Sequence, residues 1–434
     1  MFRRGTAVLL VVALAVAASC SSDDKSSDAS DKVKISFWVN WEGDDAKALQ
    51  AVIDRFEATH ENIQVDMTEA VSDTGKLLAA IQGGTAPDAV ATYDQSSIGK
   101  LCSTGAFEDL GDRISDAGIK DEQFAEGIRG AGTFEGTQCA LPYLGDAFGL
   151  YYNQAMFDAA GITKAPTTLS ELADAAKKLT TYNADGSIAV AGFVPIVNFY
   201  EQYIVRYAPL TGAKYFDDAG KAALAQDEGW KGFFEWQDQL IEDLGGYDKL
   251  TKFTATSGDE FTPQNPFETG KIAMVMDGEW RTRFLQDEVP DLEYGTAPFP
   301  VLDGHPELLG ASLLGPEVMG LPKGGKHQKE AFELIQYLTT NTDAIVSFAN
   351  AIHNVPSTVA ALESPDLDLG DHFQVFLDAF NHPKSGNPPV IEQGTAYFDP
   401  ITSFAEKWQA GSVDDLDKGL QGVDSEIDQV IARG

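Results

Sequence analysis

Two aromatic–carboxylate pairs and one further tryptophan follow predicted strands in this 434-residue sequence. The pairs are Trp41-Glu42 and Tyr93-Asp94, and the single ring is Trp280. Ligands of open α/β sheets sit beyond the carboxyl ends of the strands, so these side chains are candidates for a binding site. Aromatic rings stack on the C–H faces of sugars, and carboxylates accept hydrogen bonds from neighbouring hydroxyls. These residue types therefore indicate a noncovalent site for a hydroxylated ring.

Each candidate also has a purely structural interpretation. Trp41 and Glu42 are compatible with an exposed loop, and Asp94 is well placed to cap the helix that follows it. Trp280 is compatible with simple core packing. The sequence leaves these alternatives open.

Other residues near these candidates are assigned to the surface or the core. We expect Glu279 and Arg281, on either side of Trp280, to be solvated. Three further tryptophans lie among apolar residues at helical spacing, which predicts core packing. They are Trp230, Trp236 and Trp408.

The usual motifs of hydrolytic, nucleotide and redox chemistry are missing from the sequence. G-x-S-x-G, H-E-x-x-H, the P-loop and C-x-x-C are all absent. The spacing of Asp366, Asp368 and Asp371 does not fit an EF-hand, so we favour an acidic surface turn over a calcium site. A secreted glycoside hydrolase is the enzymatic alternative, since it needs only two carboxylates about 5 to 9 Å apart. We expect no catalysis, no metal and no cofactor.

The N-terminus has the plan of a signal peptide, which we assign to residues 1–19. Basic residues at the start precede an apolar run from Ala7 to Ala18. That run is shorter than the roughly 20 residues of a membrane-spanning helix. We therefore expect export rather than a membrane span.

Cys20 stands where bacterial lipoproteins carry the cysteine that receives lipid. The preceding residues resemble a lipobox, although Ala17 occupies a position that is usually Leu, Val or Ile. We expect lipidation of Cys20 and an anchor on the outer face of the cytoplasmic membrane; plain secretion is the alternative. Residues 20–32 are rich in Ser, Asp and Lys and suit a flexible tether.

Charge and the remaining cysteines limit the partners further. The formal net charge is −36 and becomes about −38 when the signal peptide is removed. Such a chain repels nucleic acid and anionic lipid head groups.

Cys102 and Cys139 can form a disulfide in the exported part, with two buried thiols as the alternative.

The elements that must position these residues alternate between strands and helices. Strand patterns occupy 33–39, 63–67, 272–276 and 318–321, and helical apolar spacing occupies 46–56, 168–179, 331–338 and 416–430. About 400 residues after the tether exceed what one core usually serves, so two domains are expected. The fold class is α/β.

With these elements placed, the chain resembles the extracellular solute-binding proteins of carbohydrate ABC importers, the family that includes maltose-binding protein. The similarity covers nearly the whole mature chain and rests on the order and spacing of several segments. These are ISFWVNW at 35–41, GGTAPDAVATYD at 83–94, LPYLGDAFGLYYNQAMFDAAGI at 141–162, APTTLSELADAAKKL at 165–179, FETGKIAMVMDGEW at 267–280 and LPKGGKHQKEAFELIQYL at 321–338.

The resemblance implies a periplasmic-binding-protein-like fold of two lobes, with an interlobe ligand cleft and hinge crossings. We expect the crossings near residues 139–143, 297–300 and 341–345. Lobe 1 then holds residues 33–140 plus 299–342, and lobe 2 holds residues 141–298 plus 343–434. Binding would close the hinge, and a membrane permease would take the solute from the closed form.

The resemblance also adds ligand-binding candidates. Tyr143 and Asp146 lie at the first expected crossing, and Gly310, Ala311 and Ser312 resemble a small-residue binding loop of the family. Asn354 and Tyr397 are weaker candidates. We expect a monomer that binds a mono- or oligosaccharide and delivers it to an ABC permease. It would contact the membrane through the lipid alone. A peptide or polyol is the alternative ligand.

Overall fold

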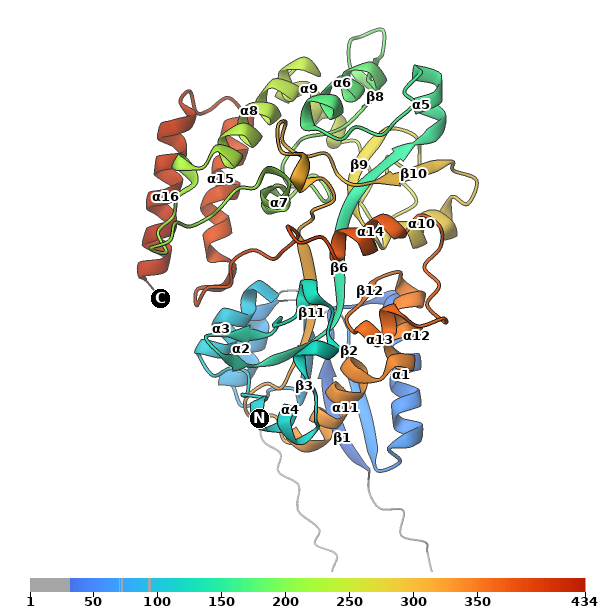
Figure 1. Cartoon of the computed structure of the whole chain (residues 1–434), viewed down its shortest axis with the longest axis vertical. Helices are drawn as coiled ribbons and strands as arrows, with labels where there is room; N and C mark the ends of the chain where they lie inside the picture. The colour runs from blue at the N-terminus through green and yellow to red at the C-terminus, as the bar shows by residue number, and fades with distance from the viewer. Residues whose placement is uncertain (1–31, 70, 72, 93–94, 434) are drawn as a thin grey trace, which may run out of the picture.

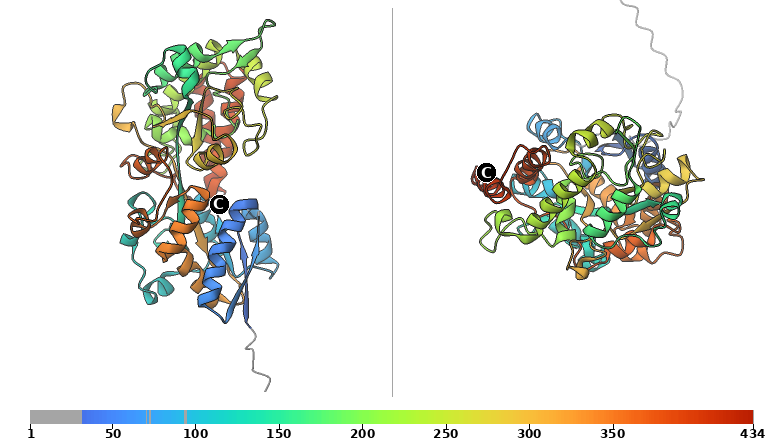
Figure 2. Two further views of the ribbon diagram at one scale, coloured as in Figure 1. Left: turned by 90° about the vertical axis from the view of Figure 1, so that its right-hand side faces the viewer. Right: turned by 90° about the horizontal axis from the view of Figure 1, so that it is seen from above.

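The computed structural model describes residues 32–69, 71, 73–92 and 95–433. The predictions for the signal peptide, most of the tether, Cys20, Tyr93 and Asp94 lie outside these residues. Figure 1 shows the described elements as two α/β lobes stacked along the long axis of the molecule, and the side view in Figure 2 shows the same arrangement. The α/β class predicted from the alternating pattern is confirmed.

Lobe 1 is built on a sheet whose strands the sequence pattern predicts well. Strand β1 (Val33–Trp38) pairs in parallel with β2 (Ile63–Thr68) and β3 (Ala89–Thr92). Strand β11 (Leu314–Gly320) runs antiparallel to β3. Alternate residues of β1 are fully buried against helices α1 (Gly43–Thr59), α11 (Gln328–Thr340) and α12 (Thr342–Ile352), as period-two patterning requires.

Strand β6 (Ala140–Asn153) runs through both lobes. Its first half pairs with β11, and its second half pairs with β9 (Met274–Gly278) and β10 (Tyr294–Ala297). The change of partner falls between Ala147 and Phe148, which face Leu314 of β11 and Gly278 of β9 respectively. The first crossing therefore lies several residues after the predicted 139–143.

The other two crossings also differ from the prediction. Phe299 and Leu308 pack in the core of lobe 2, so the chain returns to lobe 1 only near Ser312, where β11 begins. Helix α12 packs in the core of lobe 1, and the chain passes toward lobe 2 at helix α14 (Gln374–Phe380), which lies beside β6 between the lobes, rather than near residue 341. An apolar helix face indicates burial but not which core buries it, which explains both shifts.

Lobe 2 surrounds the second half of β6 with helices. These helices include α5 (Gln154–Ala160), α6 (Leu169–Leu179), α8 (Glu228–Asp243), α15 (Phe398–Gln409) and α16 (Leu416–Ala432). Trp230 is fully buried, and the Nε1 atoms of Trp236 and Trp408 donate to Leu169 O at 2.8 Å and Phe234 O at 3.2 Å. The prediction of core packing for these three rings is confirmed.

Shorter elements complete the two lobes. In chain order they are α2 (Thr74–Gln82), α3 (Ile98–Ser103), α4 (Gly111–Asp116), β4 (Thr133–Phe134), β5 (Thr137–Gln138), β7 (Thr181–Tyr182), β8 (Ile188–Val190), α7 (Ala208–Thr211), α9 (Tyr247–Thr254), α10 (Arg281–Glu288), β12 (Val355–Pro356) and α13 (Val359–Leu362). Cys102 of α3 is disulfide-bonded to Cys139, just before β6, with their Cα atoms 5.8 Å apart. Within the described ranges, no helix is long and apolar enough to span a membrane.

Two glycines let helix α14 approach the crossing strand. A Cβ atom on Gly145 would lie 2.6 Å from the ring of Phe380, and one on Gly149 would lie 2.9 Å from the ring of Phe376. Both distances are shorter than real Cβ contacts. The small residues of β6 therefore allow α14 to brace the strand where it passes between the lobes.

Candidate functional site

A cavity of about 840 Å³ lies between the lobes. Lobe 1 contributes the segment that follows β1. Lobe 2 contributes Arg206 from a 3-10 helix at Ile204–Tyr207, Phe261 from the long loop before β9, and the first turn of α10. Strand β6 and the end of α12 form its floor at the hinge. The lining residues are Asn40, Trp41, Glu42, Gly43, Asp44, Asp45, Asp146, Arg206, Phe261, Trp280, Arg283, Phe284, Ile352 and Asn354.

The wall from lobe 1 is polar. Asn40 is buried, and neither atom of its side-chain amide forms a hydrogen bond within the described part of the chain. A buried amide without partners is costly, so Asn40 is suited to bind a polar ligand. Glu42 is exposed and precedes α1 without a side-chain capping bond, which leaves its carboxylate facing the cavity.

Trp41 borders the cavity mainly through its edge. Only 3% of the residue is exposed, and its ring lies edge-on to Tyr143 at 6.0 Å and to Phe348 at 5.1 Å. This packing belongs to the core of lobe 1. Trp41 is therefore placed to shape the wall rather than to offer an open stacking face.

The wall from lobe 2 is aromatic. Trp280, at the N-terminus of α10, is half-buried and lies edge-on to Phe148 at 5.6 Å. Its Nε1 atom has no hydrogen-bond partner among the described residues. Phe284 lies one helical turn further, on the same side of α10. Trp280 thus provides a ring at one edge of the cavity.

A pair of carboxyl groups forms the floor. Asn354 Nδ2 donates to Asp146 Oδ1 and to Glu279 Oε1, both at 2.7 Å, and Ala147 N donates to Glu279 Oε2 at 2.9 Å. The two carboxyl groups also hydrogen-bond to each other. Burial raises the pKa of Asp146 to about 7, and burial together with the charge of Asp146 raises the pKa of Glu279 well above its usual value. One proton shared between the two carboxyl groups provides the hydrogen bond between them and avoids placing two negative charges side by side.

Both arginines that line the cavity already have acidic partners. Arg206 forms an ion pair with Glu201 and lies with its guanidinium carbon 3.8 Å from the ring centre of Phe148. Arg283 of α10 forms an ion pair at 2.9 Å with Asp45 of α1, across the cleft. The positive charges at this site are therefore neutralised by the protein itself.

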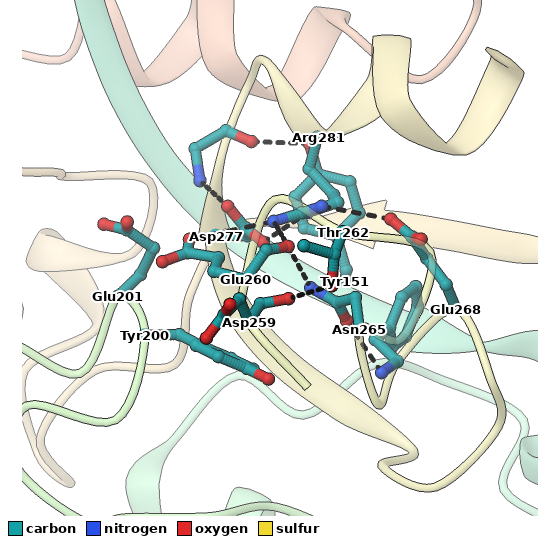
Figure 3. A network of polar contacts seen from close by, with 12 residues as sticks. Tyr151, Tyr200, Glu201, Asp259, Glu260, Thr262, Asn265, Glu268, Asp277 and Arg281 are labelled. Atoms are coloured by element: carbon teal, nitrogen blue, oxygen red, sulfur yellow. Dashed lines mark hydrogen bonds and ion pairs between the residues drawn. The ribbon is translucent and has the colours of Figure 1, made fainter. Parts of the chain in front are cut away.

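A second charged cluster surrounds Arg281 (Figure 3). The guanidinium of Arg281 is 2.7 Å from Asp277, 3.0 Å from Glu268 and 3.7 Å from Glu260. Arg281 is 1% exposed and Glu279 is fully buried. The expectation that both residues are solvated is therefore wrong, because each folds back from α10 onto buried polar partners.

With this geometry in place, the chain can be compared with known proteins. The family model for bacterial extracellular solute-binding proteins matches residues 40–345. The chain is a bacterial extracellular solute-binding protein. The solute-binding protein is 24% identical over 364 residues to the maltotriose-binding protein of Pyrococcus abyssi, covering 82% of this chain and 70% of that one.

Further relatives extend over more of the chain. The maltooligosaccharide ABC transporter solute-binding lipoprotein of Streptococcus pneumoniae is 24% identical over 423 residues, which is 93% of this chain and 92% of that protein. The solved structure of CpMnBP1 with mannotriose bound matches with a TM-score of 0.81 at 24% identity, covering 91% of this chain and all of that one. The two-lobe periplasmic-binding-protein fold predicted from the sequence is confirmed.

Several predicted binding residues of the solute-binding protein do line the cavity. They are Trp41, Glu42, Asp146, Trp280 and Asn354. Trp41, Glu42 and Trp280 follow strands β1 and β9, as the strand-end rule predicts, whereas Asp146 lies within β6 and Asn354 follows α12.

Other predicted binding residues lie elsewhere in the structure. Tyr143 is fully buried in lobe 1 and stacks on Phe348 at 5.5 Å, because it points to the helix-covered face of β6. Tyr397 is fully buried in lobe 2, where its hydroxyl donates to Pro389 O at 2.8 Å. Neither of these two tyrosines is among the residues that line the interlobe cavity.

The small-residue loop of Gly310, Ala311 and Ser312 is also absent from the cavity lining. Ser312 Oγ accepts a hydrogen bond from Phe148 N at 2.8 Å, and Ser312 N donates to Ser385 Oγ at 2.9 Å. These bonds tie the three crossing segments together. The loop therefore braces the hinge and lies outside the cavity lining.

Sequence reasoning missed several lining residues. Asn40 ends the first strand and could have been found by the rule that selected Trp41. Phe284 lies four residues after Trp280, a spacing that puts both on one helical face. Arg206 and Phe261 lie in segments without periodicity, and no local signal distinguishes them.

Proposed function

We propose that this solute-binding protein captures a neutral carbohydrate between its two lobes and delivers it to an ABC import permease. The observation that carries this proposal is that Trp280 and Asn40 line one interlobe cavity, and that the buried indole N–H and side-chain amide of these residues have no hydrogen-bond partner in the described part of the chain. Rings and amides in this combination match the faces and hydroxyls of sugars. The names of the maltotriose- and maltooligosaccharide-binding relatives support the same ligand class.

The charge of the cleft favours a neutral ligand over an anionic one. Glycerol-3-phosphate-binding proteins are also among the relatives, with 26% identity over 176 residues for that of Agrobacterium fabrum. A phosphate ester needs free cationic donors. Here Arg206 and Arg283 are engaged by Glu201 and Asp45, and Asp146 adds a further carboxyl group to the lining. We therefore expect phosphorylated and acidic sugars to be rejected.

The carboxyl groups of the floor argue against glycosidase chemistry. A glycosidase needs two carboxyl groups about 5 to 9 Å apart on either side of the scissile bond. Asp146 and Glu279 instead hydrogen-bond directly to each other and to Asn354. We propose a binding protein without turnover, in which the ligand draws the two lobes together about the hinge.

A calorimetric screen tests this proposal. Unphosphorylated mono- and oligosaccharides, polyols, peptides and glycerol-3-phosphate would each be added to the purified mature protein, and unfolding would be followed. A ligand at 100 times its dissociation constant adds about 2.7 kcal/mol to the free energy of unfolding. We expect this stabilisation from a neutral carbohydrate only. Stabilisation by glycerol-3-phosphate or a peptide instead, or release of reducing ends from any oligosaccharide, would contradict the proposal.

We further propose that Cys20 carries a lipid that holds the monomeric protein at the outer face of the membrane. The lipobox-like residues before Cys20 and the lipoprotein named among the relatives support this anchor. In a bacterial host, wild-type protein should fractionate with membranes, and Cys20→Ser should not incorporate labelled fatty acid. Restoring a typical lipobox with Ala17→Leu should raise the labelled fraction. Equal labelling of wild type and Cys20→Ser would exclude the anchor.

A further inference from the structure

Phe261 is a large apolar side chain that the fold leaves in the open. It is 55% exposed, the highest value among the large hydrophobic residues that the described ranges contain. It lies in the loop between α9 and β9 and lines the rim of the interlobe cavity. Exposure of an aromatic ring at a binding cleft is a common sign of a contact surface for a ligand.

The loop that presents Phe261 is fixed by buried polar contacts. Glu260 O accepts hydrogen bonds from Arg281 Nη2 at 3.2 Å and from Asn265 Nδ2 at 2.9 Å (Figure 3). The hydroxyl of Tyr200 donates to Gly258 O, three residues before Phe261. These bonds fix the segment that leads into Phe261, and the bond from Asn265 spans this residue, so little ordering is needed when a ligand arrives.

The ring continues the aromatic wall of the cavity. Its centroid is 5.7 Å from that of Phe284, which follows Trp280 on α10. The guanidinium carbon of Arg281 lies 5.2 Å from the centre of Phe284 and 5.6 Å from that of Phe261. Arg281 thus holds the loop to α10 and keeps the two phenyl rings together. The wall passes from half-buried Trp280 to exposed Phe261.

We propose that Phe261 stacks on a sugar ring beyond the one at Trp280, so that the cleft selects an oligosaccharide over a monosaccharide. This inference rests on the carbohydrate binding proposed above. Arg281 acts as the positioning residue for this outer ring. The volume of about 840 Å³ lies in the upper part of the range for small-molecule sites, which leaves room for more than one sugar unit.

A chain-length series tests the inference. Glucose, maltose, maltotriose and maltotetraose, and mannose, mannobiose and mannotriose, would be titrated into wild type, Phe261→Ala and Phe261→Trp. We expect Phe261→Ala to weaken the longest bound sugar about tenfold and to leave the shortest within about twofold. Phe261→Trp should restore the preference for length. Tyr182→Ala is the matched control, since Tyr182 is 46% exposed but does not line the cavity.

The outcomes separate the two proposals. If wild type binds sugars but Phe261→Ala weakens all lengths equally or none, the outer stacking role is wrong and carbohydrate binding stands. If wild type binds a monosaccharide as tightly as its oligomers, the selection for length is wrong. If wild type binds no sugar of any length, both proposals fall.

Discussion

Arg283 of α10 and Asp45 of α1 form an ion pair at 2.9 Å that joins the two lobes across the mouth of the ligand cavity. The side chains are 16% and 30% exposed, so the pair is partly screened from solvent. It connects the first turn of the lobe 1 helix to the helix that carries Trp280. The pair is therefore suited to favour the closed arrangement of the lobes.

Removing this ion pair should favour opening. We expect Arg283→Gln to increase the radius of gyration of the unliganded protein in small-angle scattering. It should also weaken ligand binding about fivefold, which corresponds to the free energy that a partly buried ion pair contributes. The control is Lys47→Gln, because Lys47 and Asp44 form a fully exposed pair within lobe 1. Identical scattering of both variants would show that the pair does not hold the lobes.

The carboxyl pair should make stability depend on pH. Burial raises the pKa of Asp146 from 3.8 to about 7, so between about pH 4 and 7 the native protein binds more protons than the unfolded chain. The contribution of Asp146 to the free energy of unfolding therefore falls as the pH rises through this window, by up to about 1.4 kcal/mol per pH unit. Asp146→Asn keeps the acceptor for Asn354 and should remove this slope.

Urea unfolding at pH 4.5, 5.5, 6.5 and 7.5 would check the slope. Relative to wild type, Asp146→Asn should become steadily more stable as the pH rises. Asp44→Asn is the control without a slope, since hydrogen bonding to Lys47 lowers the pKa of Asp44 from 3.8 and places any pH dependence of its contribution below this window. Parallel curves for wild type and Asp146→Asn would contradict the shared-proton account.

Trp280 should contribute strongly to binding and weakly to stability. Loss of a stacked ring of this size is expected to weaken sugar binding by about 30- to 100-fold in Trp280→Ala, measured by titration calorimetry. Because the Trp280 side chain is only half-buried, its removal should lower the melting temperature only slightly. Trp408→Phe provides the reverse control, because Trp408 packs in lobe 2 and donates to Phe234 O. It should lower the melting temperature and leave affinity unchanged; the opposite pattern would place the ligand elsewhere.

The disulfide between Cys102 and Cys139 should stabilise lobe 1 without affecting binding. The bond closes a loop with a sequence separation of 37, which corresponds to roughly 3 to 4 kcal/mol in the chain-entropy model. The double variant Cys102→Ser/Cys139→Ser should lose about this much free energy of unfolding. Its affinity should match wild type, since neither cysteine lines the cavity. Unchanged stability in denaturant would show that the bond contributes nothing in solution.

Much of the site followed from a simple rule about strand ends. Trp41, Glu42 and Trp280 were predicted because they follow strands, and all three line the cavity. Tyr143 was predicted from its place at the first expected crossing instead, and it lies within β6 and points to the helix-covered face. Whether a strand residue faces a helix or a cleft depends on the register between β6 and its partners, and this register is not a local property.

The sequence by itself determined the local elements and the family. Periodicity reports which face of a segment is apolar, so β1, α1, α6 and α16 were found close to their true positions. The tertiary structure alone decided which core α12 joined and that Glu279 and Arg281 are buried. These outcomes depend on partners far away in the chain, such as Asp146 and Asn354 for Glu279, and a charged residue gives no local sign that such partners exist.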